Sequence, residues 1–287
     1  MRDKSPLIVI VSIIMTLSAC GSDDTNNSSS NGSSADAGAS AVDAGASATD
    51  AGDNRPSISY QLALAGVWES AFGGNETISD STWETPYGTS TVEKFNNDER
   101  WMITQNAADL KDNPSKFNRV LWTEPKSVTK DGFTHTMTYV CTVAYGLDSL
   151  ELAEGSTQTA DDSDPAKSGC GGFGWTGLST IETEGTWKTN FGGVEIINRQ
   201  AWSKSWLRGF VNKDRVAFTQ NPEDAEYAPG RFNRLQWTAN SAGKWYYCTT
   251  DFDLESLQAA KDSTKTADDS DPAKSGCGGF AWTEMTP

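Results

Sequence analysis

A run of fifteen residues occurs twice in this chain, and the rest of the sequence is arranged around it. The letters TADDSDPAKSGCGGF fill residues 159–173 and again residues 266–280, without one change. Upstream of each run, the segments FNRVLWT and FNRLQWT also correspond, so the duplicated module is about 105–115 residues long. That length is normal for a domain with its own core. We therefore expect two homologous domains with separate cores, at residues 58–178 and 179–287.

The strongest strand signal lies in the second half of each module. Residues 245–252 and their counterpart, residues 138–145, are rich in aromatic and other β-preferring side chains. Cys248 and Phe252 share one face of the later strand, and the other copy has a cysteine and a tyrosine at the same positions. We therefore expect this face to point into the core.

One short helix per module is predicted directly after this strand. Residues 253–261 carry Leu254 and Leu257 three positions apart, with Asp253 as the expected N-cap, and residues 147–153 are the counterpart. Five or six strands and one helix in about 110 residues favour a small β-barrel or β-sandwich. The expected fold is mainly β, with two such domains in tandem.

Each module also opens with a Gly-x-Trp motif, Gly66 to Trp68 in the first copy and Gly185 to Trp187 in the second. This motif resembles the first strand of lipocalin-like and related calycin barrels. The resemblance implies a barrel in which the tryptophan closes one end.

The N-terminus has the pattern of an export signal over residues 1–19. Its apolar stretch, Leu7 to Ala19, is too short to cross a hydrocarbon layer of about 30 Å. The closing letters LSAC resemble the lipobox of bacterial lipoproteins, which implies cleavage before Cys20 and acylation of its sulfur. Because Gly21 replaces the aspartate that marks inner-membrane retention, the resemblance implies an outer-membrane anchor, on either face. The alternative is an ordinary secretory signal with an unrelated cysteine.

Residues 20–57 are expected to form a disordered tether, because Ser, Ala, Gly, Asp and Asn dominate and cannot bury enough apolar surface to fold. Such a tether reaches about 35 Å on average. The formal net charge of −16 disfavours nucleic acid and anionic lipid surfaces as partners. The expected membrane contact is therefore the N-terminal lipid alone.

Four of the five cysteines belong to the repeats, two per module and 29 positions apart in each. In an exported protein this spacing predicts two disulfides, Cys141–Cys170 and Cys248–Cys277. Closing a loop of about 30 residues stabilises the fold by about 3–4 kcal/mol. Metal binding by these thiols is the alternative, but no histidine accompanies them.

Tryptophan is abundant, with eleven residues in the chain, and most of them are expected to fill the small cores. Trp83 and Trp202 occupy matching positions in otherwise polar strands, so they are candidates for contacting a ligand. We expect removal of the Trp202 indole to abolish binding while sparing the fold. Strand alternation places Arg119 and Arg234 opposite the nearby tryptophans, either inward toward a ligand or outward as solvated charges.

Signatures of catalysis are not found. The single histidine, His135, lies in a segment without a counterpart in the second copy, so Ser/His and Cys/His nucleophile systems are unsupported. The carboxylates leave a hydrolase as an alternative. The aspartates of the repeated run lack the spacing of a calcium loop and favour a polar turn, although calcium binding stays open. No cofactor or metal is expected.

These observations predict a non-catalytic, lipid-anchored envelope protein that displays two binding modules. The expected ligand is a glycan or a small apolar molecule. A structural or adhesion role, through contact with another protein, is the alternative from a different class.

Overall fold

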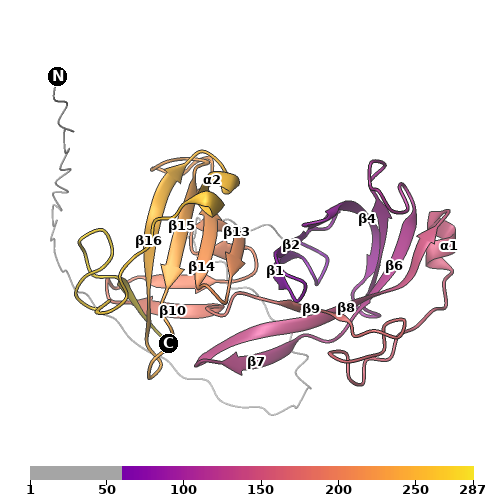
Figure 1. Cartoon of the computed structure of the whole chain (residues 1–287), viewed down its shortest axis with the longest axis horizontal. Coiled ribbons are helices and arrows are strands. Elements are labelled where there is room, and N and C mark those ends of the chain that lie inside the picture. Colours follow the sequence, from indigo (N-terminus) through magenta and orange to yellow (C-terminus); the bar gives the residue numbers. More distant parts are fainter. Residues whose placement is uncertain (1–59) are drawn as a thin grey trace, which may run out of the picture. The chain divides into compact units, whose positions relative to one another are not determined.

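The structure is a computed structural model that describes residues 60–287 (Figure 1). The expected signal sequence, the expected acylation site Cys20 and the expected tether up to residue 57 lie outside the described residues.

The first repeat folds into a closed, antiparallel barrel of eight strands, called barrel 1. Pairing of β6 with β8 and of β9 with β1 closes the circle. An additional strand, β7 (Lys126–Lys130), pairs only with the first part of β8 and forms a hairpin with it. The barrel strands are β1 (Gly66–Ser70), β2 (Asn75–Ile78), β3 (Thr82–Thr85), β4 (Gly88–Asn96), β5 (Trp101–Asn106), β6 (Phe117–Trp122), β8 (Phe133–Leu147) and β9 (Thr176–Ser179).

The second repeat forms barrel 2, which is also closed and has eight strands in sequence order. Its strands are β10 (Gly185–Thr189), β11 (Val194–Ile197), β12 (Ala201–Trp202), β13 (Ser205–Val211), β14 (Val216–Gln220), β15 (Phe232–Trp237), β16 (Trp245–Leu254) and β17 (Thr283–Thr286). The prediction of a mainly β fold is confirmed, and both domains are barrels and not sandwiches.

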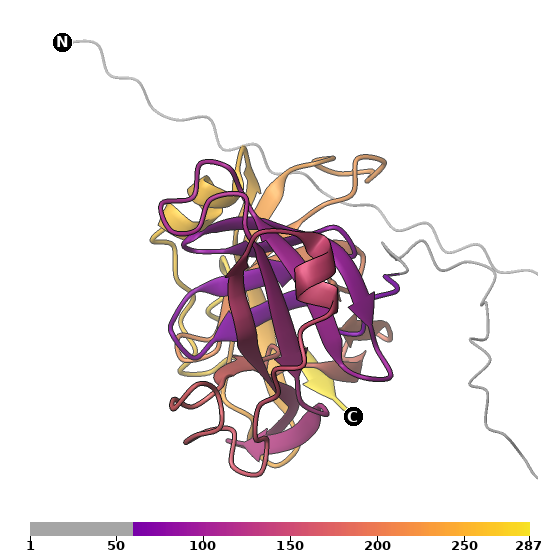
Figure 2. The ribbon, with the colours of Figure 1, turned by 90° about the vertical axis from the view of Figure 1, so that its right-hand side faces the viewer.

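Each barrel carries one short helix on its outer wall: α1 (Leu150–Glu154) and α2 (Leu257–Asp262). Figure 2 shows α1 outside the strands of barrel 1. The predicted cap was wrong, because Asp253 still belongs to β16 and Ser256 caps α2 by accepting a hydrogen bond of 3.1 Å from Ala259 N–H. Within the described residues, neither helix has the length and apolarity that crossing a membrane requires.

The face of β16 that points into barrel 2 is the opposite of the one predicted. Trp245 lies in the core, whereas Phe252 is 70% exposed. Cys248 is buried although it lies on the outer face, because its disulfide holds the loop of residues 266–280 against the wall. The register between β15 and β16 also shifts on both sides of Arg234, close to Phe252.

Both predicted disulfides are present. Cys141 is bonded to Cys170 and Cys248 to Cys277, with Cα–Cα distances of 5.7 Å in each case. Each bond ties the repeated fifteen-residue loop to the long strand of its own barrel.

The expectation of two separate cores needs correction. The core cluster of barrel 2 includes Val67 and Phe133, which belong to the first repeat. Phe133 begins β8 next to the turn of the β7–β8 hairpin, at its tip. It is fully buried and packs edge-on against Trp245, with ring centroids 5.7 Å apart. Figure 1 shows β7 and the first part of β8 extending toward barrel 2. The hairpin therefore fills part of the barrel 2 core.

The segment between the barrels is packed and not a free linker. In residues 180–184, between β9 and β10, the side chains of Thr180, Ile181 and Thr183 are fully buried. Glu182 accepts a 2.7 Å hydrogen bond from the indole N–H of Trp237 in barrel 2. The boundary between the repeats is therefore fixed by buried contacts.

Candidate binding sites in the two barrel mouths

Each barrel has a cavity at the end where the β5–β6 loop or the corresponding β14–β15 loop crosses it. The cavity of barrel 1, called mouth 1, has a volume of about 290 Å³, and that of barrel 2, called mouth 2, about 440 Å³. Seven lining positions correspond between the repeats. They are Trp83, Ser90, Thr104, Asn106, Asn118, Val120 and Thr142 in mouth 1, and Trp202, Ser205, Thr219, Asn221, Asn233, Leu235 and Thr249 in mouth 2.

An identical pair of asparagines forms the polar wall of both mouths. In mouth 1, Asn118 Nδ2 donates to Asn106 Oδ1 at 2.8 Å, and in mouth 2, Asn233 Nδ2 donates to Asn221 Oδ1 at the same distance. A serine hydroxyl donates to the accepting oxygen in each case, at 3.4 Å and 3.1 Å. The amide side chain of asparagine carries both a donor group and an acceptor oxygen, so each asparagine can take part in two such bonds at once.

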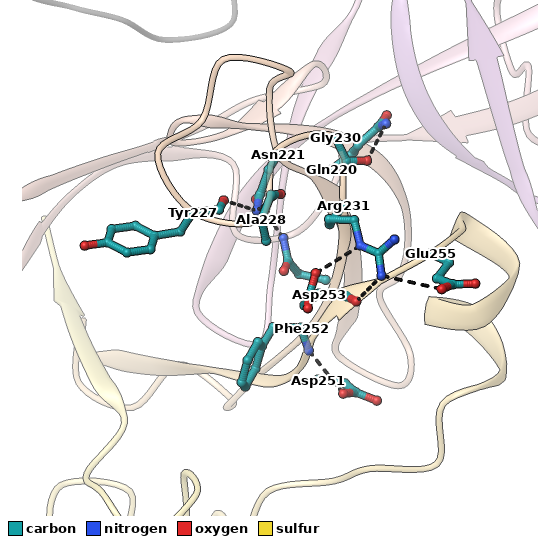
Figure 3. A network of polar contacts seen from close by, with 11 residues as sticks. Gln220, Asn221, Tyr227, Ala228, Gly230, Arg231, Asp251, Phe252, Asp253 and Glu255 are labelled. Carbon is teal, nitrogen blue, oxygen red and sulfur yellow. Dashed lines mark hydrogen bonds and ion pairs between the residues drawn. The ribbon is translucent and has the colours of Figure 1, made fainter. Parts of the chain in front are cut away.

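In each pair, the asparagine that accepts through Oδ1 also donates through Nδ2 to the loop that borders the mouth. Asn221 Nδ2 donates to the carbonyl oxygens of Tyr227 and Ala228 at 3.2 Å and 3.0 Å (Figure 3). Arg231 secures the end of this loop by donating to Asp253 Oδ1 at 2.9 Å. In barrel 1, Asn106 Nδ2 donates to Asn113 O at 2.9 Å. In both barrels, hydrogen bonds from an asparagine amide to backbone carbonyls therefore hold the loop at the rim of the mouth.

The loop of barrel 1 closes further over its cavity than the loop of barrel 2. Leu110 lines mouth 1 and lies against Gly88, where an added β-carbon would be 2.4 Å from Leu110 Cδ1. The corresponding residue in barrel 2, Ala225, does not line mouth 2. This difference in side-chain size is consistent with the smaller volume of mouth 1.

Both candidate tryptophans lie at the mouths, as part of the lining described above. Trp83 is half-buried, and its Nε1–H donates to Glu76 Oε2 at 2.8 Å. Trp202 is only 3% exposed and packs against the rings of Trp237, Trp245 and Tyr247. The expectation that the fold would tolerate loss of the Trp202 indole is therefore wrong, because its removal opens a cavity in the core.

The two candidate arginines lie on the outer walls, away from the mouths. The Arg119 guanidinium lies 4.5 Å from the ring centroid of Trp101 and donates to the carbonyls of Ala153 and Glu154 at the end of α1. Arg234 lies 5.7 Å from the ring centroid of Phe218. Outward placement is one of the two alternatives that strand alternation allowed.

The amide pair of each mouth could have been found in the sequence. The segments TQN and FNR occur in both repeats. Their asparagines lie in β5, β6 and β15 and, for Asn221, directly after β14, and all four line the mouths. A polar residue retained at an inward position of two diverged copies is an unusual feature of a small barrel.

The aspartate-rich loops have internal partners for several of their carboxylates. Asp164 pairs with Lys167 at 2.8 Å, and Asp271 pairs with Lys274 at 2.9 Å. The Ser163 N–H donates to Asp161 and holds the pKa of that carboxyl below its usual value. Among residues 60–287, no group of three His, Cys, Asp or Glu side chains is arranged to hold a metal ion.

The chemistry of the two mouths is that of recognition by hydrogen bonds. Amide and hydroxyl groups and one indole line each cavity, together with two charged side chains: Lys111 and Asp112 in mouth 1, and Glu195 and Lys204 in mouth 2. Neutral donors and acceptors next to an aromatic ring suit a neutral ligand that carries hydroxyl groups. Comparison with protein-family models, curated proteins and solved structures finds no match to this chain.

Proposed function

We propose that this protein is a non-catalytic binding protein that holds a neutral, hydroxyl-rich ligand, such as a glycan, in its two barrel mouths. The observation that carries the proposal is the repeated lining: tryptophan, serine, two threonines and two hydrogen-bonded asparagines at corresponding positions. A wall of this kind orients hydroxyl groups through fixed amides and supplies an apolar ring beside them.

Two mouths on one chain would raise the avidity for a polymer that presents repeated units. Linking two weak sites makes the second binding event intramolecular, which strengthens the overall binding without any new contact. This effect favours a glycan over an isolated small apolar molecule as the ligand.

The same proposal includes display at the outer membrane. Acylation of Cys20 and the composition of residues 20–57 would place the barrels on a lipid anchor and a tether of about 35 Å average reach. The two disulfides support folding in an oxidising compartment outside the cytoplasm.

A second candidate function, adhesion to another protein, is favoured by a set of exposed aromatic side chains. They stand at corresponding positions of the two barrels and are all at least 70% exposed: Phe72, Tyr145 and Phe173 in barrel 1, and Phe191, Phe252 and Phe280 in barrel 2. Large exposed apolar side chains retained in both copies are a feature of protein contact surfaces.

A glycan array probed with the full-length chain tests the proposal, followed by calorimetric titration of the glycan that binds. Thr142 and Thr249 are exposed and line the two mouths, so the double variant Thr142→Trp, Thr249→Trp would obstruct both cavities. Lys213→Trp is the control, because this exposed residue lies in the β13–β14 turn, at the opposite end of barrel 2.

We expect the double variant to lose binding and the control to retain it. Unchanged binding by the double variant, or an array without any bound glycan, would overturn the proposal and favour adhesion through the exposed aromatic side chains.

A further inference from the structure

Two residues that line mouth 2 carry a buried donor and a buried acceptor without a partner among residues 60–287. The Trp202 Nε1–H has no hydrogen-bond partner among the described residues, although the side chain is 97% buried; Glu195 Oε2 is also buried and unpaired. Both residues line the cavity. A buried polar atom without a partner costs about 1–3 kcal/mol, so such atoms call for an explanation.

Barrel 1 shows how the same pair of residues behaves when it is satisfied internally. Glu76 corresponds to Glu195 and Trp83 to Trp202, and the strands pair in the same register, with Ile78 opposite Trp83 and Ile197 opposite Trp202. In barrel 1 the indole N–H donates directly to Glu76 Oε2 at 2.8 Å. Glu76 is buried and does not line mouth 1.

One residue explains why the two barrels differ. Tyr247 occupies the position of Val140, as their pairing with Trp237 and Trp122 shows. The Tyr247 hydroxyl donates to Glu195 Oε1 at 3.1 Å and so engages the carboxylate that would otherwise accept from Trp202. Burial, with Glu195 beside it, raises the pKa of Tyr247, so the hydroxyl keeps its proton. Valine cannot make this bond.

We infer that mouth 2 holds a ligand hydroxyl between Trp202 Nε1 and Glu195 Oε2, and that mouth 1 has no equivalent of this subsite. A hydroxyl accepts from the indole N–H and donates to the carboxylate, so it satisfies both orphaned atoms at once. The carboxylate disfavours an anionic group at this point. This inference rests on the proposed function and makes mouth 2 the tighter of the two sites.

The first test follows the indole N–H signals of the full-length, ¹⁵N-labelled chain by NMR. The probes are methyl α-glucoside, methyl α-mannoside and methyl β-galactoside, with N-methylacetamide to represent an amide ligand. We expect at least one glycoside to move the Trp202 signal downfield, as a new hydrogen bond does, and to leave the Trp83 signal in place.

Three outcomes would overturn the inference. Equal shifts of Trp202 and Trp83 would leave the proposed function standing and remove the preference for mouth 2. A response to N-methylacetamide alone would replace the hydroxyl with an amide. No response of either indole to any probe, with glycan binding retained on the array, would place the ligand elsewhere.

The second test uses Tyr247→Phe, which keeps the ring and removes the hydroxyl that engages Glu195. The carboxylate should then accept from Trp202, as in barrel 1, so the Trp202 signal of the free protein should move downfield. The affinity of mouth 2 for the bound glycoside should fall about tenfold, the effect of losing one hydrogen bond of about 1.4 kcal/mol.

Tyr246→Phe is the matched control. Its hydroxyl also donates to a glutamate, Glu284 Oε2 at 3.0 Å, but it does not line mouth 2. We expect this variant to bind like the wild type. Equal affinity of the Tyr247→Phe variant and the wild type would contradict the inference.

Discussion

The guanidinium of Arg199, in barrel 2, lies 4.7 Å from the ring centroid of Trp68, in barrel 1. Its Nη1 donates to Ala63 O at 3.0 Å, and its backbone carbonyl accepts from Val67 N–H at 2.8 Å. Trp68 is fully buried beneath it. One arginine from the second repeat therefore covers a core tryptophan of the first.

Replacing this arginine should loosen the contact between the barrels. Arg199→Ala removes a cation–π contact and a hydrogen bond, and we expect unfolding to become easier by about 1–3 kcal/mol. Limited proteolysis should then cut at residues 180–183, which are buried between β9 and β10. Arg119→Ala is the control, because its ring partner Trp101 lies within barrel 1. Resistance to cleavage equal to that of the control would argue against this role for Arg199.

Phe133 belongs to the first repeat but should stabilise barrel 2, because it packs in the core of that barrel. Phe133→Ala leaves a cavity beside Trp245 and is expected to cost about 3–5 kcal/mol in chemical denaturation. Phe72→Ala should change the stability by less than about 0.5 kcal/mol, because that ring is 71% exposed. If the two variants unfolded at the same denaturant concentration, the shared core would be disproved.

The disulfide of barrel 2 should act on its own barrel. The double variant Cys248→Ser, Cys277→Ser is expected to lose about 3–4 kcal/mol, because opening a loop of about 30 residues restores entropy to the unfolded chain. Denaturation monitored by fluorescence gives the loss, and the same substitutions at Cys141 and Cys170 provide the comparison. Peptide mapping without reduction should find only the two links within repeats.

The stability of the fold should depend on pH through His135. Burial lowers the pKa of this histidine below its ordinary 6.5, although Glu182 and Glu184 oppose the shift. The unfolded chain therefore binds more protons than the folded one just below pH 6.5. Stability should be full above this pH and decline as the pH falls toward the folded pKa, by at most about 1.4 kcal/mol per pH unit.

Comparison with His135→Gln isolates this effect from the titration of the carboxylates. The variant should lose less stability than the wild type between pH 6.5 and pH 5 when melting temperatures are measured at each pH. Parallel curves for the two proteins would show that His135 does not contribute.

Acylation at Cys20 stays a prediction, because this residue lies outside the described part of the chain. The sulfur is the expected acyl acceptor, so Cys20→Ala should abolish labelling by a clickable fatty acid and leave the protein unprocessed or released. Labelling of the variant at the wild-type level would refute the resemblance to a lipoprotein signal.

The duplication and the cysteine spacing were sufficient to predict the two β-domains and their disulfides. Both features are local, since the matched spacing of Cys141 and Cys170 with Cys248 and Cys277 is visible without any knowledge of packing. The closure of the barrels and the N-cap of α2 could not be predicted in this way. They depend on which strands pair and on where β16 ends, and the periodicity of the sequence contains neither.

The prediction of which face of β16 points into the barrel was wrong for a physical reason. Alternation alone does not say which face of a strand is inside, and the disulfide loop buries Cys248 on the outer wall. Phe252 shares that wall beyond the loop and is exposed. The inward asparagines of the mouths were not predicted, because strand alternation does not show which polar side chains point into a barrel.

The contact between the repeats could not be predicted because it depends on where the copies differ. Arg199 stands where the first copy has Asp80, and the segment of His135 has no counterpart in the second copy. Such differences look like neutral divergence in a sequence. Only the fold shows that both positions meet at one contact region.

The β7–β8 hairpin occurs in only one of the two barrels, so the contact that it makes is directional. Head-to-tail contacts between like units close into rings or extend into open filaments, depending on the rotation between units. Within residues 60–287, barrel 2 has no counterpart of β7, and its own core already holds Phe133. The site in barrel 2 that receives the hairpin is therefore already occupied within a single polypeptide.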